Sequence, residues 1–231
     1  MTERGMIFNA EMVRAILDGR KTQTRRVVKG VEGADSFTPE WDINGEQIFV
    51  VCGEKDHTQM NPVLGAISCP FGAVGDRIWV RETFQGPLVS EELFEEYRAY
   101  PEKFETPQYC EYAADGGARP EYCDLDDNLR HGWRPSIHMP RWASRILLEI
   151  TSVRVERLND ISQEDAQAEG MELTGWRPTY SDPDSGGEVW TPYDNFAELW
   201  QSIYSVGSWL SNPWVWVIEF RRIEGGDHAT N

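Results

Sequence analysis

Residues 19–26 crowd cations and hydroxyl groups into one short segment, Gly-Arg-Lys-Thr-Gln-Thr-Arg-Arg. Lysine and arginine make most protein contacts with phosphate, so this composition indicates a site for a nucleotide-like ligand. An alternative is a solvated edge strand whose basic residues oppose aggregation. In a regular strand Lys21 and Thr24 point to opposite faces. A site that uses both therefore requires a bulge or a turn just after Gly19. The candidate residues are Arg20, Lys21, Thr22, Thr24, Arg25 and Arg26.

A carboxylate on an apolar strand face is the second candidate. Residues 77–83 read as a strand, and its alternation places Glu82 on the same face as Ile78 and Val80. A carboxylate there is costly unless a cation or hydrogen-bond donors satisfy it, and Lys21 is one candidate partner. Alternatively, Glu82 lies at the strand end and reaches water. The opposite face carries Arg77, Trp79 and Arg81.

The third candidate is the segment from residue 133 to residue 142, in which arginine and tryptophan alternate with proline. Such a stiff platform suits the stacking of bases and contact with phosphate. Its candidate ligand-binding residues are Trp133, His138, Arg141 and Trp142, and Trp79 and Arg81 are added from the strand before it. The alternative is a structural loop in which Trp142 fills the core and Arg141 pairs with an acid of an insertion.

The elements that must position these residues follow from capping and periodicity. A first helix is expected at residues 10–18, because Asn9 can cap it and Gly19 can end it in the left-handed conformation. Extended chain is expected at residues 22–28. The variable stretch from residue 30 to residue 65 contains one predicted strand, at residues 47–52.

The later elements alternate between strands and short helices. Branched residues predict a strand at 145–158, Ser162 opens a short helix ending at Glu169, and Asp194 is the expected cap of a helix reaching residue 204. A short helix near residues 91–97 and a last strand at 214–223 complete the order. This order predicts an α+β fold around a mostly antiparallel sheet or barrel. The chain is interpreted as one domain, residues 1–231, with insertions near 30–65, 86–130 and 174–192.

Charge is distributed unevenly along the 231 residues, whose net charge is -17. Residues 91–127 contain twelve acids and three bases, which predicts a loosely packed acidic insertion. Residues 20–29 contain five bases and no acid, so a locally basic surface can exist within an acidic field. No apolar run has the length of about 18 residues that a membrane span needs, and no signal peptide is evident. We expect a cytoplasmic protein without membrane partners.

Cofactor and metal signatures are weak. A zinc site from Cys52, His57 and Cys69 is conceivable, but neither cysteine belongs to a C-x-x-C pair, and we expect no metal. The sequence also lacks a glycine-rich phosphate loop and the G-x-S-x-G and H-E-x-x-H motifs, so hydrolysis of the P-loop type is disfavoured and no cofactor is expected.

Five segments together resemble the ASCH domain, a member of the PUA-like β-barrel superfamily, in the longer form found in phages and prophages. They are residues 19–26, 70–82, 136–145, 157–162 and 212–216. The resemblance covers nearly the whole chain apart from the insertions. It implies a PUA-like barrel flanked by helices, a cleft that binds RNA or modified bases, and a phage-encoded protein in the host cytoplasm.

A small bacterial ASCH group that is similar around the basic segment hydrolyses N4-acetylcytidine. That similarity implies Thr24 as nucleophile, Lys21 as base and Glu82 as the group that orients or neutralises. Burial beside Arg20 and Arg25 would lower the pKa of Lys21, whereas Glu82 would raise it.

Three functions are therefore open. The first is an amidohydrolase of a modified nucleoside, the second a non-catalytic reader of RNA or modified DNA, and the third an acidic phage protein that binds and blocks a host nucleic-acid-handling factor.

Overall fold

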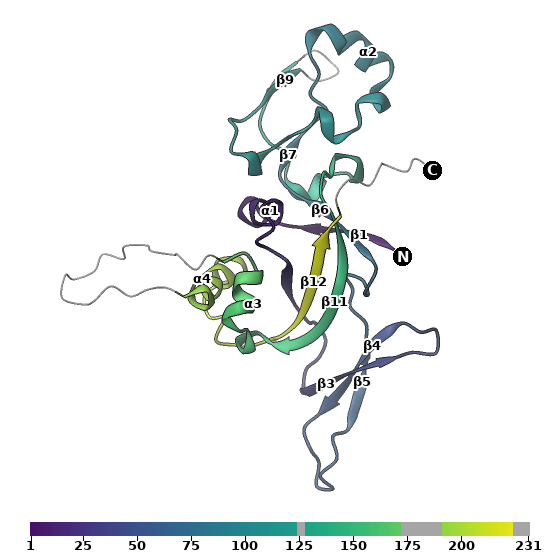
Figure 1. Ribbon diagram of the computed structural model, residues 1–231, viewed down its shortest axis with the longest axis vertical. Coiled ribbons are helices and arrows are strands. Elements are labelled where there is room, and N and C mark those ends of the chain that lie inside the picture. Colours follow the sequence, from purple (N-terminus) through teal and green to yellow (C-terminus); the bar gives the residue numbers. More distant parts are fainter. Residues whose placement is uncertain (124–127, 172–190, 224–231) are drawn as a thin grey trace, which may run out of the picture. The chain divides into compact units, whose positions relative to one another are not determined.

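The structure is a computed structural model that describes residues 1–123, 128–171 and 191–223 (Figure 1). Its fold is α+β with mainly antiparallel sheets, as the sequence predicts. The described residues divide into two compact units. Unit 1 holds those within 1–19, 76–149 and 222–223, and unit 2 holds those within 20–75 and 150–221.

Unit 1 is organised around strand β6, Arg77–Arg81. Strand β1, Glu3–Ile7, runs parallel to β6, with Gly5 opposite Trp79. On its other side β6 pairs antiparallel with the first three residues of β11, which spans Leu147–Arg157 and continues into unit 2. The buried side chains Ile78, Val80 and Leu148 face the core of this unit.

Helix α1, Ala10–Leu17, follows the predicted pattern. The side chain of Asn9 accepts a hydrogen bond from the backbone amide of Met12 at 2.8 Å. Gly19 has φ +74° directly after the helix, a conformation that glycine adopts without steric cost. The predicted cap and the predicted end of this helix are both confirmed. The strand β1 that precedes it was not predicted.

The acidic segment of unit 1 contains short elements around an aromatic cluster. The rings of Phe94, Tyr97, Phe104 and Tyr109 contact one another in sequence, and Phe104 is buried. The described part of this segment thus has a small aromatic cluster around Phe104, while α2 itself buries no residue. The strands here are β7 (Phe84–Gln85), β8 (Glu111–Tyr112), β9 (Glu121–Cys123) and β10 (Leu129–His131), and the α-helix is α2 (Phe94–Ala99). The 3-10 helices of unit 1 are Glu91–Leu93, Pro101–Phe104, Pro107–Tyr109, Ala113–Asp115, Ser136–His138 and Arg141–Ala143.

Unit 2 combines two helices with the rest of β11 and the strands β2 (Gln23–Val27) and β12 (Trp214–Arg222). Strand β2 pairs antiparallel with β12, with Thr24 opposite Ile218. Helices α3 (Gln163–Ala168) and α4 (Pro192–Tyr204) pack against Val215 and Val217 of β12. A 3-10 helix, Leu158–Asp160, follows β11.

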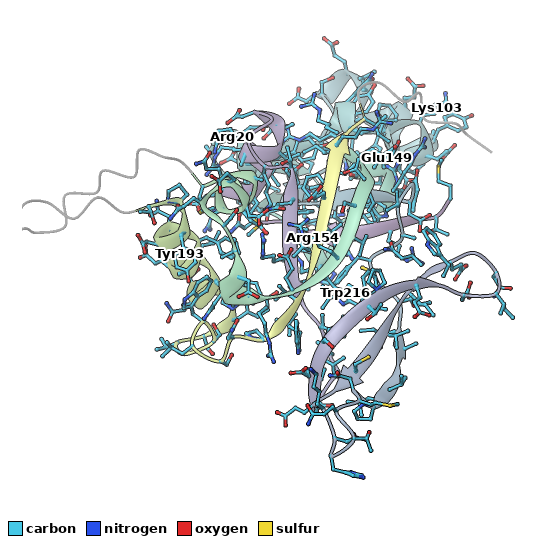
Figure 2. The ribbon with its side chains drawn as sticks, turned by 60° about the horizontal axis from the view of Figure 1, so that its bottom comes forward. Arg20, Lys103, Glu149, Arg154, Tyr193 and Trp216 are labelled. Carbon is cyan, nitrogen blue, oxygen red and sulfur yellow. The ribbon has the colours of Figure 1, made fainter. Side chains whose placement is uncertain are left out.

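A second, three-stranded sheet belongs to unit 2. It consists of β3 (Ala34–Trp41), β4 (Gln47–Gly53) and β5 (Val63–Ile67), with β4 in the middle. The ring of Phe49 on β4 meets that of Trp216 on β12 edge-on, with centroids 5.2 Å apart (Trp216 is labelled in Figure 2). The predicted strand at 47–52 is confirmed, whereas its neighbours β3 and β5 were not predicted.

Two further expectations change. Helix α4 is capped by Thr191, and Asp194 is the reciprocal member of the capping box, so the predicted cap was placed three residues too late. The insertion expected at 174–192 lies outside the described residues up to 190, and Pro192 begins α4. Within the described chain the strands form open sheets, so the closed barrel remains a prediction. None of the described helices has the length and apolar character that a membrane span requires.

Candidate functional site

Lys21, shortly before strand β2, and Arg25 within it direct their side chains to one face of the unit 2 sheet. Arg25 lies opposite Val217, and Val217 belongs to the core that α3 and α4 cover, so Arg25 points towards those helices. Lys21 and Gln23 point to the same side, because their side chains bond to Glu169 and Asp165 at α3. Regular alternation thus places every second residue of this segment against α3.

Two of these cations, Lys21 and Arg25, converge on the carboxylate of Glu169. The Nζ atom of Lys21 lies 2.5 Å from Oε2 of Glu169, and Nη1 of Arg25 lies 3.2 Å from Oε1. The side chains of Lys21 and Arg25 are 0% exposed and that of Glu169 is 2% exposed. We call these three residues the Glu169 cluster. Because they are buried, the expectation of a solvated basic strand is wrong.

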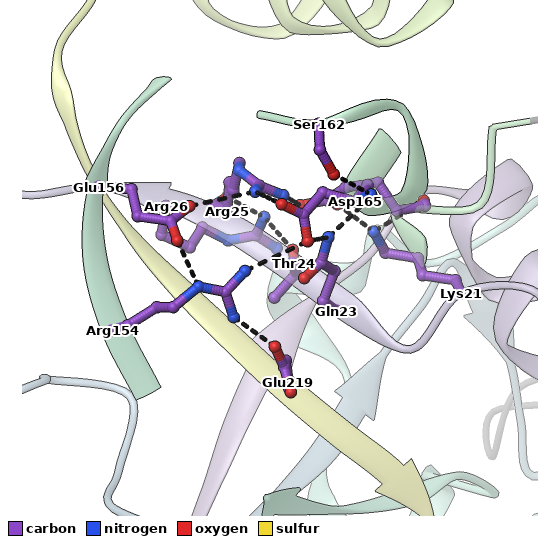
Figure 3. Close-up of polar contacts among 11 residues, drawn as sticks. Lys21, Gln23, Thr24, Arg25, Arg26, Arg154, Glu156, Ser162, Asp165 and Glu219 are labelled. Carbon is purple, nitrogen blue, oxygen red and sulfur yellow. Dashed lines mark hydrogen bonds and ion pairs between the residues drawn. The ribbon is translucent and has the colours of Figure 1, made fainter. Parts of the chain in front are cut away.

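Further carboxylates surround Arg25. Its Nη2 atom lies 3.3 Å from Asp165 and 3.4 Å from Glu156. Arg154 of β11 joins Glu156 to Glu219 of β12 by hydrogen bonds from its guanidinium group (Figure 3). The cations of this face are therefore neutralised within unit 2, which leaves the face poorly suited to binding phosphate.

Burial lowers the pKa of Lys21, and the hydrogen bond and charge of Glu169 counteract part of that shift. A lysine with a lowered pKa is closer to acting as a base at neutral pH. Its Nζ, however, already donates to the Glu169 carboxylate and to the Glu169 carbonyl oxygen, the latter at 3.0 Å.

Thr24 and Arg26 occupy the other face of β2. They lie opposite Ile218 and Trp216, and Nη1 of Arg26 donates to Oγ1 of Thr24 at 2.8 Å. Thr24 is fully buried, and no register shift occurs between β2 and β12. The structure therefore does not bring Lys21 Nζ and Thr24 Oγ1 together on one face.

Glu82 belongs to unit 1 and has its own cation. Both of its oxygens accept hydrogen bonds at 3.0 Å from Nε and Nη2 of Arg145, and Arg145 also pairs with Asp115 at 2.7 Å. The guanidinium group lies over the ring of Tyr112, 3.9 Å from its centroid. Burial raises the pKa of Glu82, and the Arg145 hydrogen bonds oppose that shift. We call Glu82, Arg145 and Asp115 the Arg145 cluster.

Glu82 is thus buried on the predicted side of its strand, and the alternative of a carboxylate that reaches water is wrong. Its cation is Arg145, whereas the ion pair of Lys21 is with Glu169. The three residues implied as a catalytic set, Lys21, Thr24 and Glu82, are divided between two units.

An aromatic and basic surface lies on the opposite face of β6. A Cβ atom on Gly5 would approach the Trp79 indole to 2.6 Å, so the ring rests on β1 where this strand has no side chain. The guanidinium carbon of Arg81 lies 5.4 Å from the Trp79 ring centroid. Both side chains are partly exposed.

Neighbouring residues hold this surface in place. Arg81 donates hydrogen bonds to the carbonyl oxygens of Ser136, at 3.1 Å, and Ile137. Glu3 of β1 pairs with Arg141 at 3.0 Å and with Arg77 at 3.7 Å. We call Arg77, Trp79, Arg81 and Arg141 the Arg–Trp surface.

Only some residues of segment 133–142 lie near the Arg–Trp surface. His138 is exposed and follows the carbonyl groups that Arg81 contacts, and Arg141 joins β1 through Glu3. Trp142 is partly buried against a core cluster that includes Phe84 and Met139, so the core role anticipated for it holds. Trp133 is partly buried, and Arg141 pairs with Glu3 instead of an insertion acid.

Arg20 is exposed at the other end of the basic segment, in unit 2, and donates to the carbonyl oxygen of Gly170 at 3.0 Å. Within unit 2 it thus lies next to Glu169, which Arg25 also contacts. Among the residues described, no group of three or more His, Cys, Asp or Glu side chains is arranged to hold a metal ion.

Several residues of these sites were not predicted from the sequence, among them Glu169, Arg145, Asp115 and Gly5. Glu169 follows α3 directly, where a carboxylate faces the unfavourable end of the helix dipole, and that mismatch is a signal for a cation partner. Gly5 carries no signal by itself, because its role depends on the pairing of β1 with a strand more than 70 residues later.

No family model, no curated protein and no solved structure matches this chain.

Proposed function

We propose that this protein binds nucleic acid, through the Arg–Trp surface of unit 1, without changing it chemically. The observation that carries the proposal is the partly exposed Trp79 indole, seated on Gly5 with Arg81 beside it. Aromatic rings stack on bases of any sequence, and arginine adds cation–π contact and attraction for phosphate. This surface has three arginines and two neighbouring carboxylates, those of Glu3 and Glu149, so it carries an excess of one positive charge although the chain is acidic.

Single strands fit this surface better than a duplex. Stacking on Trp79 requires an unstacked base, which single-stranded RNA and DNA offer. The Ser136 and Ile137 carbonyls fix the Arg81 guanidinium, so less side-chain freedom is lost when a ligand binds.

The test is fluorescence anisotropy with labelled single-stranded RNA and DNA oligonucleotides over a range of salt concentrations. Trp79→Ala should weaken binding about tenfold, and Trp79→Phe should recover much of the loss because stacking is retained. Arg81→Ala should weaken binding and reduce its salt dependence, whereas Arg98→Ala, which removes an exposed arginine elsewhere in unit 1, should leave both unchanged.

Gly5→Ala tests the packing of the Trp79 indole on β1 without changing the net charge. The added methyl group forces the ring to move, so affinity should fall while the net charge stays constant. Equal affinities for the wild type and Trp79→Ala, or no binding at low salt, would exclude the proposal.

An amidohydrolase of N4-acylated cytidine is the second candidate, and the lowered pKa of Lys21 favours it. It is weaker because Lys21 and Thr24 project from opposite faces of β2. The test is release of acetate from N4-acetylcytidine. Release by the wild type that is lost in both Lys21→Ala and Thr24→Ala would establish the amidohydrolase in place of a protein that only binds.

A further inference from the structure

A cavity of about 520 Å³ lies within the acidic segment of unit 1. Its walls are formed by the loop after β7, helix α2 and the strands β9 and β10, which contribute Leu88, Phe94 and Leu129. Its volume falls within the range of about 300–1,000 Å³ that is typical of ligand sites in proteins. Leu129 is 61% exposed, so the apolar wall is open to a partner.

The charged residues of the wall have one sign. Among the described residues, Glu91 and Glu121 line the cavity and no lysine or arginine does, and both carboxylates are exposed. Glu121 lies across the β9–β10 ladder from His131, with its carboxylate 3.3 Å from Nδ1 of the imidazole. A ligand that fits must therefore join an apolar group to positive charge.

The residues around the cavity also favour a positively charged ligand. The described residues 91–123 carry nine acids and three bases. Two of the bases are already paired inside the segment, Arg98 with Glu95 and Lys103 with Glu96. A ligand with several positive charges gains more from this field than a single amine does, whereas nucleic acid is repelled by it.

We propose that this cavity binds a basic protein segment in which an apolar side chain alternates with arginine or lysine. The apolar side chain enters between Leu88, Phe94 and Leu129, and the flanking cations lie on Glu91 and Glu121. This site is separate from the Arg–Trp surface and does not depend on nucleic-acid binding.

The experiment titrates the full chain with three fluorescein-labelled hexapeptides and measures anisotropy. The peptides are alternating arginine and leucine, arginine alone, and alternating glutamate and leucine. The first should bind at least about tenfold more tightly than the second, because only it fills the cavity, and the third should not bind. Leu129→Ser should remove most of the difference between the first two peptides.

A matched pair of double variants separates the cavity from general acidity. Glu91→Gln with Glu121→Gln should weaken binding of the arginine–leucine peptide about tenfold, whereas Glu92→Gln with Glu102→Gln, the same charge change outside the wall, should weaken it by less than about threefold. Equal losses in the two double variants, equal affinities for the arginine–leucine and arginine peptides, or no binding at low salt would each overturn the proposal.

Discussion

The Glu169 cluster and the Arg145 cluster are made from the same kinds of group, and they differ in their access to water. In the first, two cations share one carboxylate, and all three side chains are at most 2% exposed. In the second, one cation is shared by two carboxylates, of which Glu82 is 2% and Asp115 is 53% exposed. Water can therefore replace a lost partner on one side of the Arg145 cluster but not in the Glu169 cluster.

The difference indicates distinct roles. Charges that are sealed from water cannot meet a ligand without local opening, so the Glu169 cluster fixes how β2, α3 and β11 pack in unit 2. The residue types of segment 19–26 predicted a locally basic surface, but Lys21 and Arg25 are buried.

The largest expected effect is that of Glu169→Gln. Lys21 and Arg25 would remain buried without the carboxylate that they share, so the free energy of unfolding should fall by about 3–5 kcal/mol. Urea denaturation followed by circular dichroism measures it. Glu164→Gln, an exposed change in α3, is the control and should stay within about 0.5 kcal/mol of the wild type. Similar decreases in the free energy of unfolding for the two variants would mean that water reaches the Glu169 cluster.

A smaller effect is expected for Arg145→Met. It leaves Glu82 buried without its cation, but partial exposure at Arg145 lets water enter, so a loss of about 2 kcal/mol is expected. Asp115→Asn removes only the exposed partner and should cost less than about 1 kcal/mol. The same urea series tests the ranking. A greater loss for Asp115→Asn than for Arg145→Met would contradict the difference in exposure between the two partners.

The smallest effect is a pH dependence of stability. Because burial raises the pKa of Glu82 above 4.5, the folded chain retains its proton over a pH range in which the unfolded chain has released it. This group therefore stabilises the fold fully below pH 4.5, and the contribution is lost as pH rises through the folded pKa. In Glu82→Gln the contribution is absent, so the melting-temperature difference between wild type and variant should shift against the wild type as pH rises from 4 towards neutrality. A difference that is constant with pH would show that the pKa of Glu82 is not raised.

Local signals predicted the elements whose ends are made by neighbouring residues. Asn9, Gly19 and Ser162 act within a few positions of the backbone groups that they cap, so their helices were predicted with nearly correct bounds. Strict alternation also placed Glu82 on the buried face of its strand. The error at α4 was local too, because Thr191 and Asp194 both belong to one capping box.

Partners distant in sequence could not be predicted in the same way. Lys21 and Glu169 are 148 positions apart. Nothing in residues 19–26 indicates with which carboxylate Lys21 and Arg25 pair. The edge strands β1 and β5 are short and mostly exposed, so neither shows the apolar alternation by which a strand is recognised. The seat of Trp79 on Gly5 depends on the parallel register of β1 and β6, which the sequence does not specify.

Each unit consists of segments that are not contiguous in the sequence, and this affects the order of folding during synthesis on the ribosome. Unit 1 lacks few of its described residues once residue 149 has emerged, whereas β2 waits for its partner β12 at residues 214–222. Domains generally fold in the order in which they emerge, so unit 1 should form first. Lys21 and Arg25 therefore lack their carboxylate partners at least until residues 156–169 have emerged, and β2 lacks its neighbouring strand until residues 214–222 follow.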